Sequence, residues 1–498
     1  MATELLPGIQ FPRDGRGRHS STRSGKAILA AVLELGDVAA AQALRDETDW
    51  RRRYVRHLVA INRAGATDGV LAVAMARAAL AQAEREFEFV RDSRTVPLAE
   101  AMRSATRIAG SGLASIERRG SGDAAVQPWA LPYRGRDLQG NEARDAVEGW
   151  RERGLCEPGH ADALLRVIDH PEWFDLADRT LVLLGAGSEA GPLQWLTRWR
   201  ARIVAVDLPR RDTWQRIGAI VDAGNATVIA PLHAGRRDWL DAGADLLTDT
   251  PEIAAWLTEG VGDDTPLDVA AIAYLDGERH VRVAVAMDAI AGAVAAARPD
   301  TGRMFMATPT DAFVVPAATA CEAMRRWDER DLLARAAGAP LRALTGGRWL
   351  KPHVTELIGD HGVVDALVVE QGPNYALAKR LQQWRATVAQ ADGERVSFNV
   401  APSTSTQSVV SNPALKAGFG GAHHFGIEVF EPATTNALMA ALWVHDLRAG
   451  PGAGAPLAHP LDALTRQAHH GGLWRVGYLP RSALPLAALV GMAGRAWR

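Results

Sequence analysis

The sequence predicts an α/β protein, in which a doubly wound, mostly parallel sheet follows an α-helical N-terminal region. From Thr180 onward, short β-branched runs alternate with helical stretches, which is the pattern of a parallel sheet with crossover helices. Before that point, residues 26–119 keep apolar residues at helical spacing, most clearly in Thr67–Arg91. A glycine-rich segment follows the first expected strand directly, as at the strand-to-helix turns of such sheets.

Composition limits the function classes. The chain has 498 residues, 47% of them hydrophobic and 23% charged, which is ordinary for a globular protein with a sizeable core. A net charge of −2 argues against a dedicated nucleic-acid binder, since phosphate contacts need a basic surplus. No run reaches the roughly 18 to 20 continuous apolar residues of a membrane span. Cys156 and Cys321 are too few for a disulfide framework or a zinc site, so we expect a cytoplasmic protein without a metal.

Along the chain, the sequence predicts five parts. They are a mobile arm (1–25), a helical N-terminal region (26–125), a helical connector (126–178), the sheet domain (179–450) and a C-terminal tail (451–498). A linker that contains Gly, Ser and Pro is expected at Arg118–Pro128. The connector is expected to have helices at 141–153 and 160–168. The apolar segment Ala483–Gly494 in that tail suits the edge of a core or a contact with a second subunit better than a membrane surface.

Six strands are predicted in the sheet domain, namely Thr180–Leu184, Arg202–Val206, Ala226–Ala230, Asp268–Tyr274, Arg303–Ala307 and Arg395–Val400. The gap between the fifth and sixth strands is far longer than one crossover helix needs, so we expect an insertion at about 312–371. A helix at Thr434–Leu447 and a Gly/Pro-rich hinge at Ala449–Pro456 follow.

The glycine-rich segment after the first strand has the features of a dinucleotide turn. Gly185, Gly187 and Gly191 allow a tight turn and a close approach of pyrophosphate to the backbone, and the segment opens a helix expected from Leu193 to Arg200. Asp207 ends the second strand, where an acid suits the ribose hydroxyls of NAD. Ser188 and Glu189 lie in the same turn. Arg210 and Arg211 would suit the 2′-phosphate of NADP, so NAD is only slightly favoured.

Tyr375 and Lys379 form the strongest candidate for chemistry. Lys is rare in this Arg-rich chain, at positions 26, 351, 379 and 416, and only five Tyr occur, so this pairing is unusual. Residues four apart share one face of a helix. A neighbouring ammonium lowers the pKa of a phenol, which makes an acid/base for neutral pH.

The order of these motifs resembles the short-chain dehydrogenase/reductase family. The turn, the acid and the Tyr-x-x-x-Lys pair are followed by Arg395-Val-Ser-Phe-Asn-Val-Ala-Pro-Ser-Thr-Ser-Thr406, similar to the strand and Thr-bearing loop that border the nicotinamide in that family. The resemblance covers about Thr180–Leu447. It implies a hydride transfer between NAD or NADP and a carbonyl or alcohol. Tyr375 would handle the proton, Lys379 would bind the ribose, and Pro402 and Thr406 would lie against the nicotinamide or phosphates.

The chain also departs from that family's pattern. Ser403 replaces a Gly after the Pro, Gly191 is followed by Pro192, and the segment Ala273–Gly277 replaces an Asn-rich one. No Ser lies about thirteen residues before Tyr375, where the chain has Gly362. Thr308 or Thr310, at the end of the fifth strand, is therefore the candidate for the hydroxyl that polarises the substrate oxygen.

Two other functions remain open from the sequence. A methyltransferase that uses S-adenosylmethionine has a similar turn and acid, and a non-catalytic NAD(P) sensor or interaction protein would explain the missing Ser. The histidine pair 423–424 is expected to have a structural or substrate-lid role, because adjacent side chains point apart and make poor metal ligands. The pair 469–470 indicates no particular function. For an oxidoreductase, the Leu, Ala and Trp content of the insertion suggests a fairly apolar small-molecule substrate.

Overall fold

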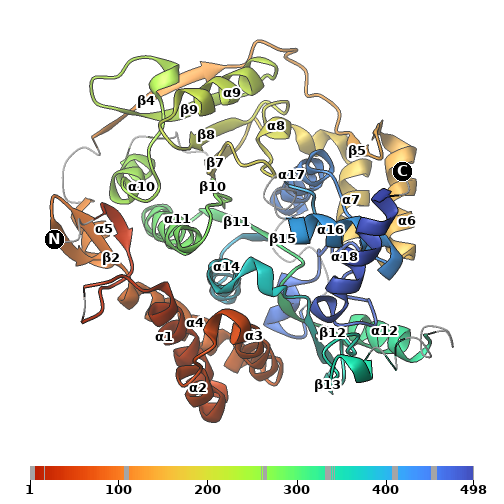
Figure 1. The fold of residues 1–498 in the computed structure, drawn as a ribbon. Coiled ribbons are helices and arrows are strands. Elements are labelled where there is room, and N and C mark those ends of the chain that lie inside the picture. Colours follow the sequence, from red (N-terminus) through yellow and green to blue (C-terminus); the bar gives the residue numbers. More distant parts are fainter. Residues whose placement is uncertain are drawn as a thin grey trace.

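A computed structural model describes residues 6–15, 17–105, 112–259, 261, 266–330, 338, 340, 342–406, 413–449 and 457–496 (Figure 1). The expected hinge falls mostly on residues 450–456, and part of the expected N-terminal arm falls on residues 1–5 and 16, so these lie outside the described residues.

A seven-stranded sheet, mostly parallel, forms the centre of the molecule. Its strands are β4 (Leu113–Arg119), β7 (Thr180–Leu184), β8 (Arg202–Val206), β9 (Thr227–His233), β10 (Leu267–Ala271), β11 (Gly302–Ala307) and β15 (Val396–Val400). Their order is β15-β11-β10-β7-β8-β9-β4, and only β4 runs antiparallel to its neighbour. The six predicted strands of the sheet domain are thereby confirmed, two of them with the predicted bounds and the others within three residues at each end.

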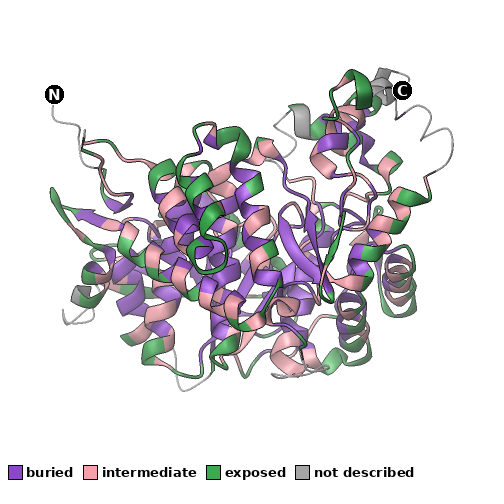
Figure 2. Cartoon of the chain, turned by 90° about the horizontal axis from the view of Figure 1, so that it is seen from below, coloured by how far each residue is buried: buried purple, intermediate pink, exposed green. Residues whose placement is uncertain are grey.

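Helices cover both faces of this sheet. Alternate residues of the strands, such as Val182 and Leu181, point into two separate apolar clusters. One face packs against α10 (Thr250–Glu259), α11 (Glu278–Ala297) and α14 (Pro373–Ala391). The other packs against α6 (Gly140–Glu152), α7 (Pro158–Asp169), α8 (Leu193–Leu196), α9 (Arg211–Asp222) and α17 (Pro432–Ala449). Figure 2 shows buried strands inside and exposed residues on the outer helical surfaces.

The N-terminal region is only partly helical, which corrects the expectation for residues 26–119. Its helices are α1 (Ser21–Gly36), α2 (Val38–Arg45), α3 (Trp50–Ala66), α4 (Gly69–Glu86) and α5 (Leu98–Ala105). A small antiparallel sheet joins β1 (Gly8–Gln10), β2 (Glu88–Arg91) and β3 (Arg94–Pro97). Ile9 of β1 is fully buried, so part of the expected arm is packed. The expected linker begins in β4, because Arg118 and Arg119 pair with β9.

The insertion and the C-terminal tail build the side of the molecule beyond β15 (Figure 1). The insertion contains β12 (Ala312–Pro316), α12 (Ala317–Asp328), β13 (Leu357–Ile358), β14 (His361–Asp365) and the short helix η3 (Val369–Gln371). Its three strands form a separate antiparallel sheet. In the tail, α18 (Pro480–Ala496) packs against α16 (Pro413–Gly421). The connector adds β5 (Leu131–Tyr133) and β6 (Arg136–Leu138) and the short helix η1 (Pro171–Phe174). Three further short helices are η2 (Trp239–Asp241), η4 (Ala422–Phe425) and η5 (Pro460–Leu464).

One helix among the described residues, α11, is long and apolar enough to cross a membrane. Most of its apolar window is buried inside the protein, where it contacts α10, α14 and β10. The helix therefore belongs to the core, and the described part of the chain indicates no integral membrane span.

Candidate functional site

A cavity of about 1230 Å³ opens at the carboxyl ends of the parallel strands. Segments that follow β7, β8, β10, β11 and β15 all line it, together with the start of α14 and residues 48–51 before and at the start of α3. Ligand pockets usually measure about 300–1,000 Å³, so this cavity has room for more than one small ligand. Its place matches the edge at which open α/β sheets bind their ligands.

The glycine-rich turn forms one wall of this cavity. Gly185 has a φ of +97°, and a Cβ there would lie 2.5 Å from the Cα of Ala273, so only glycine fits. Gly187 donates its N–H to Oδ2 of Asp207 over 2.8 Å, and the N–H of Leu208 bonds to the other oxygen. Burial raises the pKa of Asp207, while these two N–H groups oppose that rise. The carboxylate thus fixes the turn and keeps further lone pairs for a ligand.

The helix after this turn is shorter than expected. The sequence predicted helix from Leu193 to Arg200, whereas α8 ends at Leu196. Arg200 adopts a left-handed φ of +57°, and its N–H bonds to Oδ1 of Asn225, because the chain must enter β8 two residues later. A single helical turn has a small dipole, so anion binding at this wall would depend on local N–H groups.

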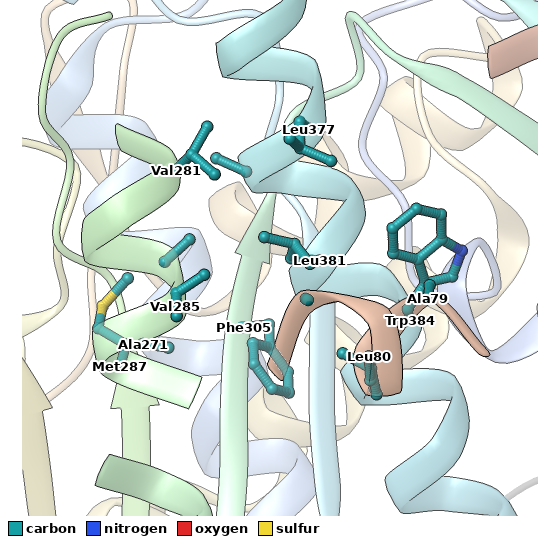
Figure 3. Close-up of a cluster of buried hydrophobic side chains, with 14 of the residues drawn as sticks. Ala79, Leu80, Ala271, Val281, Val285, Met287, Phe305, Leu377, Leu381 and Trp384 are labelled. Atoms are coloured by element: carbon teal, nitrogen blue, oxygen red, sulfur yellow. The ribbon is translucent and has the colours of Figure 1, made fainter. Parts of the chain in front are cut away.

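Helix α14 carries Tyr375 and Lys379 to the opposite wall, and both line the cavity. The helix begins at Pro373, which has no N–H to lose, after Gly372 with a φ of +86°. Its buried face is held from three sides. Figure 3 shows this cluster, which contains Leu377, Leu381 and Trp384 of α14, Val281 and Val285 of α11, Leu80 of α4 and Phe305 of β11.

The end of β11 brings the two threonines to the same place. The side chain of Thr308 interacts with the phenol of Tyr375 and lowers its pKa. Its Oγ1 lies 2.8 Å from Oγ1 of Thr310, which in turn accepts a hydrogen bond of 2.7 Å from Nε2 of Gln371. Thr308, and not Thr310, is therefore the hydroxyl that acts on the pKa of Tyr375. The sequence left this choice open.

The electrostatics of the pair differ from the sequence expectation. Burial raises the pKa of Tyr375 to about 12, although the side chain of Thr308 opposes the rise. Lys379 is not among the groups that shift this pKa, and its ammonium donates to the carbonyl of Met306 over 3.0 Å. Burial also lowers the pKa of Lys379 to about 8, against the opposing charge of Asp311. Both groups are half-buried at the wall of the cavity and have shifted pKa values, as catalytic groups often have.

Two aromatic residues beside Tyr375 were not predicted. His280 stacks on the Tyr375 ring at 5.4 Å between centroids, and Tyr274 meets it edge-on at 6.1 Å. Burial holds the pKa of His280 well below its usual range, and the Lys379 charge adds to this. His280 belongs to no recognisable sequence motif. Its position in the first turn of the helix after β10 is the only feature of the sequence that could have indicated a role at this site.

Most of the other candidates also line the cavity, namely Ser188, Glu189, Pro402 and Thr406. Gly191 does not line the cavity. A Cβ at this position would lie 3.1 Å from the carbonyl oxygen of Ser188, so the glycine is needed for the close packing of the turn. Arg210 and Arg211 are also absent from the lining, and Arg211 forms an ion pair with Asp241 at 2.7 Å. Gly362 lies in β14, away from the cavity lining.

The histidine pairs lie elsewhere. His423 and His424 form part of η4, with ring centroids 3.9 Å apart. His470 is fully buried and bonds through Nε2 to Oε1 of Glu157 at 3.0 Å, which is a structural contact. Within the described ranges, no three His, Cys, Asp or Glu side chains converge as metal ligands.

Comparison with known proteins does not assign this chain to a family. A scan against protein-family models matches none of them, and a search of curated proteins finds no match.

Proposed function

We propose that this protein is an NAD(P)-dependent oxidoreductase that resembles short-chain dehydrogenases/reductases. The observation that carries the proposal is the convergence of Tyr375, Lys379 and Thr308 in one cavity with the Gly185 turn and Asp207. The strand order around β7 supports it, because it follows the 3-2-1-4-5-6 order of Rossmann-type dinucleotide folds.

The residues fit a dinucleotide. Gly185 lines the cavity at a turn that only glycine can form, and the carboxylate of Asp207 would bind the ribose hydroxyls. A nicotinamide bound here would accept or supply the hydride. Tyr375 would take the proton of a substrate alcohol, or give one to a carbonyl oxygen, and Thr308 would hold the oxygen in place. Lys379 would bind ribose hydroxyls and carry the positive charge next to the phenol.

NAD is the better candidate than NADP. In the proposed binding mode, the charge of Asp207 would repel the 2′-phosphate of NADP, and Arg211 is already paired with Asp241. The substrate is proposed to have an apolar part, because Trp50, Phe419 and Leu484 contribute to the lining. A reducing cytoplasm suits the two free cysteines, of which Cys156 is buried.

Protection against heating by added cofactor tests the proposal. We expect NAD to raise the melting temperature of the purified protein, and S-adenosylmethionine to leave it unchanged. Asp207→Asn should weaken the NAD effect, whereas the matched control Asp212→Asn, an exposed acid in the first turn of α9, should not. A rise with S-adenosylmethionine alone would instead support the methyltransferase alternative.

Turnover separates an enzyme from a sensor. With a panel of apolar alcohols and carbonyl compounds, we expect Tyr375→Phe to keep cofactor binding and to lose reduction of NAD by at least about 100-fold, the usual scale of acid/base catalysis. A Tyr375→Phe variant as active as the wild-type protein would rule out the assigned role of Tyr375.

A further inference from the structure

Gln382 lies on the same face of α14 as Tyr375 and Lys379, about one helical turn further along. Positions i, i+4 and i+7 of a helix share one face. Tyr375 and Lys379 line the cavity, whereas Gln382 does not and is only 6% exposed. Gln382 therefore lies behind the pair, and it reaches the cavity only through the side chain of Lys379.

The amide of Gln382 connects the Lys379 ammonium to the end of a strand. Its Oε1 accepts a hydrogen bond from Nζ of Lys379 over 3.4 Å, and its Nε2 donates to the carbonyl of Ala271, the last residue of β10, over 3.1 Å. The same ammonium donates to the carbonyl of Met306 in β11 over 3.0 Å. Because β10 and β11 are neighbours in the sheet, the ammonium is held at the carboxyl ends of two adjacent strands.

These two contacts require an amide at position 382. An ammonium only donates and a backbone carbonyl only accepts, so a side chain between them must offer an acceptor to one and a donor to the other. The amide does both, and its orientation is thereby fixed. A carboxylate would place an oxygen against the carbonyl of Ala271, and an apolar side chain would satisfy neither partner.

The arrangement leaves one donor of the ammonium for a ligand. An ammonium has three N–H groups. The carbonyl of Met306 and the amide of Gln382 take two of them, and the described residues offer the ammonium no further acceptor. Since Lys379 lines the cavity, its third N–H is available to a bound molecule.

We propose that Gln382 is a positioning residue, which holds the Lys379 ammonium against the strand ends so that its remaining N–H is presented to a hydroxyl group of a ligand in the cavity. The inference rests on the proposed function for the identity of that ligand, a nicotinamide dinucleotide with its ribose hydroxyls. The position of the ammonium, by contrast, belongs to the protein without any cofactor. The pair Tyr375 and Lys379 thereby gains a third member, at the spacing Tyr-x-x-x-Lys-x-x-Gln.

The titratable groups around Lys379 do not hold its ammonium in this way. Asp311 raises the pKa of Lys379, but its carboxylate accepts a hydrogen bond from Arg380 over 3.0 Å. Burial keeps the pKa of His280 well below its usual range and raises that of Tyr375, so both are neutral at pH 7. Within the described ranges, no charged side chain forms an ion pair with the Lys379 ammonium.

The pKa of Lys379 tests the proposal in the protein without cofactor. The chain has only four Lys, at positions 26, 351, 379 and 416, so ¹³C-labelled lysine gives few side-chain signals, and Lys379→Arg identifies the one of interest. We expect this signal to titrate at about 8 in the wild-type protein. Gln382→Met keeps the length of the side chain and removes the amide, so it should lower the pKa by about one unit, the scale of a hydrogen bond to a charged group.

A second variant shifts the pKa in the opposite direction. Gln382→Glu places a carboxylate beside the ammonium and should raise the pKa of Lys379 by at least about one unit. Gln390→Met, in the last turn of α14, is the control and should leave the value unchanged. The proposal is overturned if either folded Gln382 variant titrates like the wild-type protein, so it stays testable when one of the two does not fold.

Binding of NAD tests the second half of the proposal. We expect Gln382→Met to raise the Kd for NAD by roughly 10-fold, since the ammonium loses its fixed orientation. An unchanged Kd together with a shifted pKa would refute the presentation of the ammonium to the ligand. If the wild-type protein does not bind NAD at all, the proposed function fails, and the titration still decides whether Gln382 positions Lys379.

Discussion

Gly185 combines a constrained backbone with a place in the lining of the cavity. Its left-handed φ and the 2.5 Å approach of Ala273 leave no room for a side chain. We expect Gly185→Ala to destabilise the protein by at least 1–3 kcal/mol, the cost of a strained backbone, and to abolish protection by NAD. Gly149→Ala is the matched control. That glycine lies inside α6 with open space around its Cα, so the substitution should stabilise by about 0.5–1 kcal/mol in urea unfolding.

Lys379 offers a second test at the scale of one residue, through the pH dependence of stability. Burial lowers its pKa from 10.5 to about 8, so between these values the folded state binds fewer protons than the unfolded chain. The cost of burying the ammonium is therefore complete below about pH 8 and is relieved as the pH rises towards 10.5.

We thus expect Lys379→Met to stabilise the protein at pH 7, on the order of 1–2 kcal/mol, although it removes a catalytic candidate. The gain should shrink steadily as the pH of the urea titrations increases through 8–10.5. Lys351→Met, at an exposed position, is the control and should change little. A destabilised Lys379→Met at pH 7 would show that its contacts with Met306 and Gln382 outweigh its desolvation.

Much of the site could be predicted from single residues, and the reasons are local. The Gly185 turn, Asp207 and the spacing of Tyr375 and Lys379 depend on a few neighbouring positions, and the structure brings them to one cavity. The choice between Thr308 and Thr310 could not be made, because both end the same strand and only tertiary packing decides which faces the phenol. His280 was missed for the same reason.

At the scale of elements, α14 depends on its packing between α11, α4 and the sheet (Figure 3). Leu381 is 4% exposed at the centre of this contact. We expect Leu381→Ala to cost about 2–5 kcal/mol of unfolding free energy, since it leaves a cavity that the helices cannot fill. Leu489→Ala, on the exposed face of α18, should cost well under 1 kcal/mol. Equal losses for both variants would contradict this account of how α14 is held.

Strands of the parallel sheet were predictable because they are buried on both faces and read as continuous apolar runs. A strand that was missed, β4, has no such apolar run. β4 alternates exposed and half-buried residues, among them Glu117 and Arg119, and it owes its structure to pairing with β9, more than a hundred positions away. No pattern within β4 itself indicates that partner.

At the scale of the whole molecule, the N-terminal region and the sheet share one apolar core. Residues of α1, α3 and α4 belong to the same cluster as β10, α11 and α14. Polar contacts cross the same boundary: Arg380, paired with Asp311 at 3.0 Å, also donates to Oδ1 of Asn62 in α3. The two parts should therefore not be separable.

A truncated chain tests this unity. We expect the full-length protein to unfold in one transition, with coincident fluorescence and circular dichroism curves. A chain of residues 126–498 should bind a hydrophobic dye and show no sharp transition, because it would expose the outer faces of α11 and α14 to water. If that fragment unfolds cooperatively and keeps its NAD protection, the N-terminal region is an independent domain.

Both edge strands of the central sheet are protected in a way that affects the aggregation of the protein at high concentration. An open strand edge invites pairing with a second chain. At one end, β4 presents charged side chains, including Glu117, Arg118 and Arg119. At the other, the backbone of β15 is met by the C-terminal segment, where the N–H of His469 bonds to the carbonyl of Val400. The chain thereby protects itself against the strand-to-strand aggregation to which large sheets are prone, and loss of the segment around His469 would open that route.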